Sequence, residues 1–263
     1  VRNVTGGWVQ SLADYRQRYA LHKSDADLQA MHAACPWLLT WDDHEAHNDY
    51  AGSTAGYTSP AEPATDFAAR RAAAYQAWYE HMPVRASTLM QGMAGLKAGS
   101  ELRVFQKLPW GRLANLHLLD PRQYKDPIVC TQGGRLGSST FDPRSCAPWA
   151  DPARSMLGKA QEAWLDAELA KATTAWQVLG QGSLLGPRNF KAGPEQMLWN
   201  DGWDGYPAAR QRLVQSLQKG VQASPQATPV VLGGDVHENW VGHVKANYAD
   251  AKSANVAVEF CGT

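Results

Sequence analysis

The stretch "TPVVLGGDVHENW", residues Thr228–Trp240, decides the fold class. Its first part is a short apolar run, which is typical of a strand buried inside a sheet. Gly233 and Gly234 then allow the backbone to bend tightly. Asp235 and His237 follow at once, and side chains at i and i+2 can face one metal ion. The alternative is an ordinary strand-end turn with a lone histidine.

Two other apolar runs end in the same way. "WLLTW" (residues 37–41), predicted to be a strand covered on both faces, is followed by Asp42, Asp43, His44 and Glu45. "LHLLD" (residues 116–120) is followed by Pro121 and Arg122. In open α/β sheets, ligands bind beyond the carboxyl ends of the strands. We therefore expect the polar loops of these three strands to converge on one site.

The rest of the chain alternates between helical and strand patterns, which predicts a layered α/β fold. A capping box of Ser24 and Asp27 is expected to open a helix over residues 27–34. Further helices are predicted within 61–82, over 158–172 and over 206–220, the last ending at Gly220. Residues 101–120 read as a hairpin that turns near Pro109–Gly111, and further strands are expected at 175–180, 239–246 and 255–260. No internal repeat or linker is apparent, so one domain is expected over residues 1–263.

The composition excludes several classes of protein. The chain has 263 residues, 44% of them hydrophobic, and its 25 Lys+Arg balance its 25 Asp+Glu. No basic patch indicates nucleic acid, and no run of 18 or more apolar residues indicates a membrane span. Residues 1–7 are polar and lack the apolar core of a signal peptide. The chain begins with Val1 and ends in "NVAVEFCGT", so both ends are expected to be cuts through a longer protein.

The four cysteines predict one disulfide. Cys130 and Cys146 flank "TQGGRLGSSTFDPRS", which is too rich in Gly, Ser and Pro to form a core. A bridge would stabilise this loop by roughly 3 kcal/mol and would favour an oxidising compartment. The alternative is two unpaired thiols in a cytosolic loop. Cys35 and Cys261 are expected to be buried apolar residues rather than a second pair.

The first polar cluster carries groups suited to metal chemistry. Asp, His and Asn are ligands for divalent and trivalent metals, and two metals about 3.5–4 Å apart can clamp a phosphoryl group and activate a water. Asp43 is a candidate ligand, and His44 is a candidate donor of a proton to a leaving oxygen or a further ligand. Helix caps and polar loops also concentrate such residues, and that interpretation stays open.

Three other features bear on function. Arg122 offers a bidentate fork for phosphate or carboxylate, although a surface salt bridge to Asp120 or Asp126 would explain it equally well. The loop "NDGWDGY" (Asn200–Tyr206) is either a pocket wall or an ordinary loop anchored by aromatic residues. "GQGSLLG" (Gly180–Gly186) contains no G-x-S-x-G elbow, so a serine hydrolase would lack its nucleophile.

The motifs resemble those of PhoD-like alkaline phosphatases, which belong to the calcineurin-like metallophosphoesterase superfamily. The resemblance covers nearly the whole chain. Its most specific parts are "TWDDHE" and "GGDVHENW", and it includes in order "PWLLTWDDHEAHNDYAG", "LLDPRQYKD", "DPARSMLGKAQEAWL", "WQVLGQGSLLG", "DGWDGYPAARQRL", "VVLGGDVHENWVGHV" and "EFCGT". The resemblance implies an α/β fold, a layered β-sandwich of mixed sheets flanked by helices. It also implies calcium and iron as cofactors, and export of the folded protein by the twin-arginine route to the periplasm or medium.

The resemblance also implies roles for single residues. Asp43 matches a metal-ligand position, and His44 stands beside it. Asn48 matches the first Asn of an "NNY" element, and the second is Asp49 here. Asp235 and His237 match the metal-site loop "GDxH", in which His237 is both a ligand and a candidate acid. Arg122 matches the arginine of "LDxRxY", a phosphate contact.

The chain departs from the family pattern at its start. A strand that ends in a Ser-Cys-Gln-like segment, and a "GDxxY" segment with a bridging Asp, are absent. The fold is therefore expected to be incomplete at both ends and to lack its N-terminal metal-binding motifs. A chain without a thiolate ligand and a bridging carboxylate is expected to show little or no activity alone.

The leading interpretation is metal-dependent hydrolysis of phosphate monoesters or diesters by a metal-bound hydroxide. Other divalent metals remain open, and the expected partner is a small phosphate ester. One alternative is a non-catalytic ligand-binding domain of the same fold, which would need no stoichiometric metal. Another is a metal-dependent hydrolase of a different ester, such as a lactone or a sugar ester.

Overall fold

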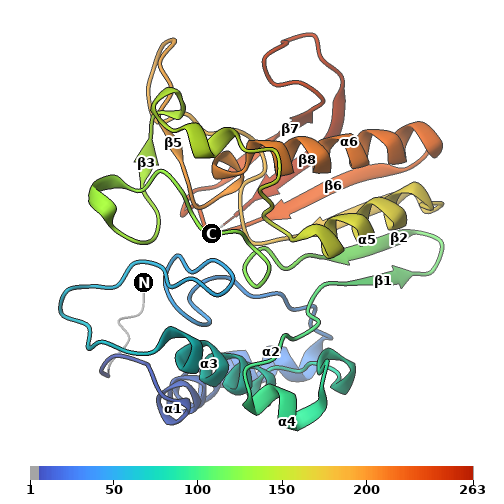
Figure 1. Ribbon diagram of the computed structural model, residues 1–263. Coiled ribbons are helices and arrows are strands. Elements are labelled where there is room, and N and C mark those ends of the chain that lie inside the picture. Colours follow the sequence, from blue (N-terminus) through green and yellow to red (C-terminus); the bar gives the residue numbers. More distant parts are fainter. Residues whose placement is uncertain (1–5, 263) are drawn as a thin grey trace. The chain divides into compact units, whose positions relative to one another are not determined.

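The structure is a computed structural model that describes residues 6–262, so the expectations about Val1 and Thr263 lie outside the described residues (Figure 1). The chain forms two compact units. The first comprises the stretch up to Leu39 together with Asp43–Asn48 and Thr58–Arg103. The second comprises Thr40–Asp42, Asp49–Tyr57 and the stretch from Val104 onward, and it contains the sheets.

The first unit is helical. Its elements are α1 (Leu12–Lys23), α2 (Ala26–Ala34), α3 (Phe67–His81), η1 (Ala86–Thr88) and α4 (Gly92–Lys97). A capping box does occur, but it lies at the start of α1, where Ser11 and Asp14 form it. The predicted box of Ser24 and Asp27 is wrong, because Asp25 caps α2 and accepts a hydrogen bond from the backbone N–H of Asp27 at 3.0 Å.

A six-stranded mixed sheet lies at the centre of the second unit (Figure 1). Its order is β1-β2-β4-β6-β8-β7, in which β2, β4, β6 and β8 are parallel and the edge strands β1 and β7 are antiparallel to their neighbours. The strands are β1 (Gln106–Trp110), β2 (Ala114–Leu118), β4 (Trp176–Gly180), β6 (Thr228–Gly233), β7 (Trp240–Lys245) and β8 (Asn255–Cys261). A separate two-stranded sheet pairs β3 (Thr140–Phe141) with β5 (Leu198–Trp199). The hairpin predicted within residues 101–120 is present, formed by the antiparallel strands β1 and β2.

Helices α5 (Lys159–Ala170) and α6 (Pro207–Ala223) pack against one face of this sheet (Figure 1). The shared core holds Leu179 of β4 and Val231 of β6 together with Leu165, Leu169, Leu213 and Leu217 of the helices. Short 3-10 turns are η2 (Gln132–Gly134), η3 (Pro143–Ser145), η4 (Ala147–Ala150) and η5 (Trp203–Gly205). The predicted α/β fold with a mixed sheet flanked by helices is confirmed. Within residues 6–262, no helix is both long enough and apolar enough to cross a membrane.

The opposite face of the sheet carries exposed apolar side chains. Leu232 of β6 lies opposite Phe260 of β8, which in turn lies opposite Val241 of β7. These three side chains, which we call the apolar row, are 44%, 47% and 73% exposed. Contiguous exposed apolar side chains of this kind mark a surface that favours association.

The segment "WLLTW" is not a strand, so that prediction is wrong. Side-chain hydrogen bonds hold its end instead of a strand ladder. The hydroxyl of Thr40 donates to the backbone oxygen of Leu119 at 2.6 Å, and the indole of Trp41 donates to Asp120 at 2.8 Å. An apolar run can therefore be extended and anchored without joining the sheet.

One helix boundary differs from the prediction. Helix α6 continues through Gly220 to Ala223. A Cβ at Gly220 would lie 3.2 Å from the backbone oxygen of Leu169, so this glycine allows close packing of α6 on α5 rather than ending the helix. Helix α3 lies within the predicted range 61–82 and is capped by Asp66.

The predicted disulfide between Cys130 and Cys146 is present, with 5.8 Å between the Cα atoms. It packs with Phe141 and Leu198 of the two-stranded sheet in a small core of its own. Cys261 is a free, buried thiol as expected. Cys35 is also free but only half-buried, because it ends α2 at the surface, so the prediction of its burial is wrong.

Candidate functional site

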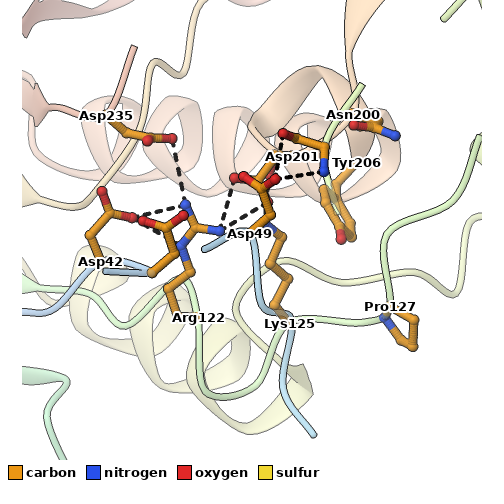
Figure 2. A network of polar contacts seen from close by, with 12 residues as sticks. Asp42, Asp49, Arg122, Lys125, Pro127, Asn200, Asp201, Tyr206 and Asp235 are labelled. Carbon is orange, nitrogen blue, oxygen red and sulfur yellow. Dashed lines mark hydrogen bonds and ion pairs between the residues drawn. The ribbon is translucent and has the colours of Figure 1, made fainter. Parts of the chain in front are cut away.

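Six charged side chains of the second unit form one polar network (Figure 2). Asp235 follows β6, Arg122 and Lys125 follow β2, and Asp201 precedes η5. Asp42 and Asp49 come from the two earlier segments of the same unit. The parallel strands β2 and β6 end at the same edge of the sheet, so their loops meet there as predicted.

The four acids form two pairs. The carboxylates of Asp42 and Asp235 approach within 4.8 Å of each other, and so do those of Asp49 and Asp201. We call the first two the outer pair, since their side chains are 32% and 19% exposed. Asp49 and Asp201 are buried and form the inner pair.

Arg122 lies between the two pairs (Figure 2). Its Nε and Nη2 contact the carboxylate of Asp42 at 3.0 and 2.8 Å, and its Nη1 contacts that of Asp201 at 2.9 Å. The Nη2 atom is also 3.5 Å from Asp235. Because the guanidinium is buried, these are low-dielectric ion pairs rather than the surface salt bridge to Asp120 or Asp126 considered above.

Lys125 neutralises the inner pair from the other side. Its ammonium donates to the backbone oxygen of Asp201 at 2.6 Å and also pairs with the Asp201 carboxylate. Burial alone would raise the pKa of Asp201, but the charges of Arg122 and Lys125 outweigh it and hold that pKa below its usual value. Asp201 is therefore ionised at neutral pH.

Asp120 shapes the turn that presents Arg122. Its carboxylate accepts hydrogen bonds from the backbone N–H groups of Arg122 and Gln123 at 3.1 and 2.9 Å, and from the indole of Trp41 at 2.8 Å. Burial raises the pKa of this carboxyl against the effect of these bonds. Asp120 thus fixes the backbone of this turn, while the guanidinium contacts the other acids.

The turn that carries Asp235 needs unusual backbone. Asp235 and His237 both have positive φ, at 68° and 56°. Such values cost energy in residues other than glycine and cluster at functional sites.

The free thiol of Cys261 donates to the backbone oxygen of Gly234 at 3.4 Å, and burial raises the pKa of that thiol to about 11. Cys261 is therefore protonated at neutral pH.

Asp49 is also held in a fixed orientation. Its φ of 58° is positive, and its Oδ2 accepts hydrogen bonds from the backbone N–H and the hydroxyl of Ser138 at 2.9 and 2.7 Å. Gly137 precedes that serine, and a Cβ there would lie 2.9 Å from the same Oδ2 atom. The neighbouring backbone and the Asp49 carboxylate are therefore closely fitted to each other.

The donor set suits a hard cation. Carboxylate oxygens are the ligands that calcium prefers, and the two pairs supply four carboxylates. Arg122 and Lys125 compensate part of the negative charge of these carboxylates. In the part of the chain that the structure describes, no histidine or cysteine joins either pair.

Of the predicted site residues, Arg122 and Asp235 lie in this network. Asp43, His44 and Asn48 belong to the first unit, and their part in the site remains a prediction. The backbone N–H of His44 donates to the Asp43 carboxylate at 2.8 Å. His237 lies on the Asp235 turn with an exposed side chain, and its predicted role also remains a prediction.

Four network residues were missed by the sequence analysis. Asp42 adjoins Asp43, which alone was singled out, and Asp49 adjoins Asn48 in the same way. Lys125 lies in the quoted motif "LLDPRQYKD", in which only the arginine was singled out. Asp201 lies in the loop "NDGWDGY", which was interpreted from its aromatic residues. Adjacency to a predicted site residue is the signal that could have found Asp42 and Asp49, whereas the sequence offers no comparable signal for Lys125 and Asp201.

Comparison with known proteins identifies the family. The model of the PhoD-like phosphatase family matches residues 1–263. The chain belongs to the PhoD-like phosphatase family. Alkaline phosphatase D of Bacillus subtilis (strain 168) is 36% identical over 263 residues, which are 100% of this chain and 41% of that protein. The chain thus spans less than half of this relative, and the resemblance to PhoD-like phosphatases seen in the motifs is confirmed.

A solved structure supports the same assignment. The structure titled "Structure of PhoD" matches with a TM-score of 0.85 and 36% sequence identity, covering 100% of this chain and 46% of that one. The mixed sheet flanked by helices is therefore the fold of a PhoD-like protein.

Proposed function

We propose that the protein containing this chain hydrolyses phosphate esters, with a divalent metal bound at the acidic pairs. The observation that carries the proposal is the convergence of the outer and inner pairs at one sheet edge, in a chain that belongs to the PhoD-like phosphatases. Substrates are proposed to be small phosphate monoesters or diesters.

Calcium is proposed as the ion of this network. Asp42 and Asp235 would hold it where substrate can approach, because the outer pair is the more exposed. A bound calcium ion supplies Lewis-acid activation of water and charge neutralisation for the phosphate. Iron is proposed only from the family resemblance. Its thiolate ligand and bridging carboxylate would come from parts of the protein other than the residues described, so this chain alone is proposed to have little activity.

Arg122 is proposed to maintain the spacing of the pairs. Its guanidinium contacts three carboxylates, and this arrangement supports a role in holding them apart from one another. Direct contact of Arg122 with substrate phosphate would require some of these ion pairs to open. His44 and His237 are proposed to give a proton to the leaving oxygen. Asp43 and Asn48 are proposed as further metal ligands.

Export is proposed from the disulfide. A Cys130–Cys146 bridge persists in oxidising compartments such as the periplasm or the medium. Recovery of the full-length protein from fractionated cells, with both thiols resistant to alkylation, would support this location.

The test uses the full-length protein with p-nitrophenyl phosphate and bis-p-nitrophenyl phosphate. We expect hydrolysis that a chelator removes and calcium restores. Asp235→Ala should lower kcat/KM by about 100-fold or more, because a methyl group cannot replace a carboxylate ligand. Asp250→Ala, a change in an exposed loop, is the control and should leave the rate unchanged. Full activity of Asp235→Ala would contradict the proposal.

A further inference from the structure

The short segment Gln181–Ser183, which follows β4, lies next to three loops of the network. These are the loops that carry Arg122, Asp201 and Asp235. The segment is the first part of the stretch "GQGSLLG" and has no place in the mechanism above. Its two side chains are buried, with Gln181 6% and Ser183 3% exposed. Because β4 lies between β2 and β6 in the sheet, the segment lies between the loops that follow those strands.

Its glycine adjoins the Arg122 loop and the outer pair. A Cβ built on Gly182 would lie 3.3 Å from the ring of Pro121 and 3.7 Å from a carboxylate oxygen of Asp42. The backbone here therefore packs directly beneath one of the four acids.

Ser183 contacts the loops of two other acids at once. A Cβ on Gly202, the residue after Asp201, would lie 2.9 Å from the Ser183 hydroxyl oxygen. A Cβ on Gly233, two residues before Asp235, would lie 2.4 Å from the Ser183 backbone oxygen. Ser183 therefore lies between the two loops, its hydroxyl against the Asp201 loop and its backbone against the Asp235 loop, at two positions where a side chain would collide with it.

Gln181 holds Ser183 in this place. Its amide oxygen accepts the backbone N–H of Ser183 at 3.0 Å, and its amide nitrogen donates to the Ser183 backbone oxygen. The same amide oxygen accepts the indole N–H of Trp203 at 3.0 Å, which ties the Asp201 loop to the segment. Both the position and the orientation of Ser183 are thus determined by its neighbours.

The hydroxyl of Ser183 contributes no hydrogen bond to the fold. It is buried, yet within residues 6–262 it has no hydrogen-bond partner. Replacement of this serine by alanine therefore removes a packed oxygen atom without breaking a hydrogen bond. This property separates a role in the site from a role in stability.

We propose that Ser183 is a positioning residue that sets the distance between the Asp201 and Asp235 loops, and hence between the inner and outer pairs. The proposal rests on the proposed function only in taking these pairs as the calcium site. Positioning groups behind metal ligands change metal affinity by roughly 10- to 100-fold when they are altered.

The experiment compares full-length wild type with Ser183→Ala, Gly202→Ala and the double variant, by calorimetric titration with calcium and by hydrolysis of p-nitrophenyl phosphate. Ser183→Ala should weaken calcium binding about 10-fold, while its thermal transition moves by less than about 2 °C. Gly202→Ala should weaken binding further, because its Cβ meets the Ser183 oxygen. The double variant should bind more tightly than Gly202→Ala alone, since the opposing oxygen is gone. Gly242→Ala, with nothing within 4 Å of its Cβ, is the matched control.

The outcomes separate the two proposals. Unchanged calcium affinity in Ser183→Ala, or losses that simply add in the double variant, would overturn the positioning role while wild-type hydrolysis upholds the proposed function. Calcium binding that depends on Ser183 in a protein that hydrolyses no phosphate ester would uphold the positioning role and overturn the function. If wild type neither binds calcium nor hydrolyses either ester, both are wrong.

Discussion

Arg122 shows how one buried cation can organise several acids. Its backbone N–H is bound by Asp120, and its side chain reaches Asp42, Asp201 and Asp235. A buried charge that loses its partner is costly, because water no longer solvates it. The stability of this end of the sheet therefore depends on a residue whose predicted role was contact with substrate.

Arg122→Met should destabilise the protein by up to about 3 kcal/mol, since it leaves the buried Asp201 carboxylate with Lys125 as its only cation in this network. The midpoint of urea unfolding measures this loss. Added calcium should restore part of it, because the ion supplies the missing positive charge. Arg144→Met is the control, because Arg144 is 69% exposed in its pair with Asp142 and should cost less than about 0.5 kcal/mol. Equal effects of the two variants would contradict this account of the network.

His117 makes a separate prediction at the residue scale. This β2 side chain is buried, its Nε2 lies 3.0 Å from the amide oxygen of Gln177, and burial lowers its pKa. The folded state thus binds fewer protons than the unfolded state. The contribution of His117 to the free energy of unfolding is therefore fully present above its unfolded-state pKa of about 6.5. It is lost as the pH falls from there through the lowered pKa of the folded state.

The urea midpoints of wild type and His117→Gln should therefore change with pH in parallel between pH 7 and 8. Below about pH 6.5 the two curves should diverge. Wild type should lose more stability on acidification than the variant. Parallel curves from pH 8 to 5 would show that His117 is not the responsible group.

At the scale of elements, the loop between Cys130 and Cys146 depends on its bridge. The small core of Phe141 and Leu198 packs there against the disulfide, and Asn200 accepts the backbone N–H of Ser139 at 2.6 Å. This loop therefore supports the segment that leads to Asp201.

The double change Cys130→Ser and Cys146→Ser should cost about 3 kcal/mol, the loop-closure entropy for this spacing. Urea unfolding measures the loss, with Cys35→Ser as the control. Because the loop supports the Asp201 segment, the double variant should also bind calcium more weakly. A double variant as stable as Cys35→Ser would indicate that the small core suffices without the bridge.

Sequence patterns predicted the central elements because their periodicity is strong. The apolar runs of β4, β6 and β8 and the helical patterns of α5 and α6 were found at nearly their observed bounds. "WLLTW" failed because an apolar run does not reveal whether its backbone bonds to a strand or its side chains bond to a loop. Gly220 failed because a glycine can serve close helix packing as well as helix termination.

The candidate site was predictable only in part, for a similar reason. Strand-end polarity identified Arg122 and Asp235, because each directly follows an apolar run. Asp201 follows the two-residue strand β5, which is too short to give a pattern. Lys125 is identified as a network member only by its burial, and burial of a single lysine is not visible in a sequence.

At the scale of the whole molecule, the sheet is covered by helices on one face and carries the apolar row of Leu232, Phe260 and Val241 on the other. Water contact with such a row is unfavourable, and burial of it against another surface would be favourable. The 263-residue chain expressed by itself is therefore expected to self-associate.

Phe260→Lys combined with Val241→Lys should shift the isolated chain toward monomer in size-exclusion chromatography with light scattering. The charges interrupt the row without altering the helix-covered face. Leu21→Lys, which changes an exposed apolar residue of α1, is the control and should leave the association unchanged. Wild-type chain that is monomeric at high concentration would contradict the prediction.

The ion pairs of Arg122 and Lys125 also bear on the order in which the protein matures. In a site made only of acids, the carboxylates repel one another until a metal binds, so folding depends on the metal. Here two internal cations already hold Asp42, Asp201 and Asp235 in place. The polypeptide can therefore reach its compact state before any metal binds, and metal binding becomes a late step in the assembly of the site.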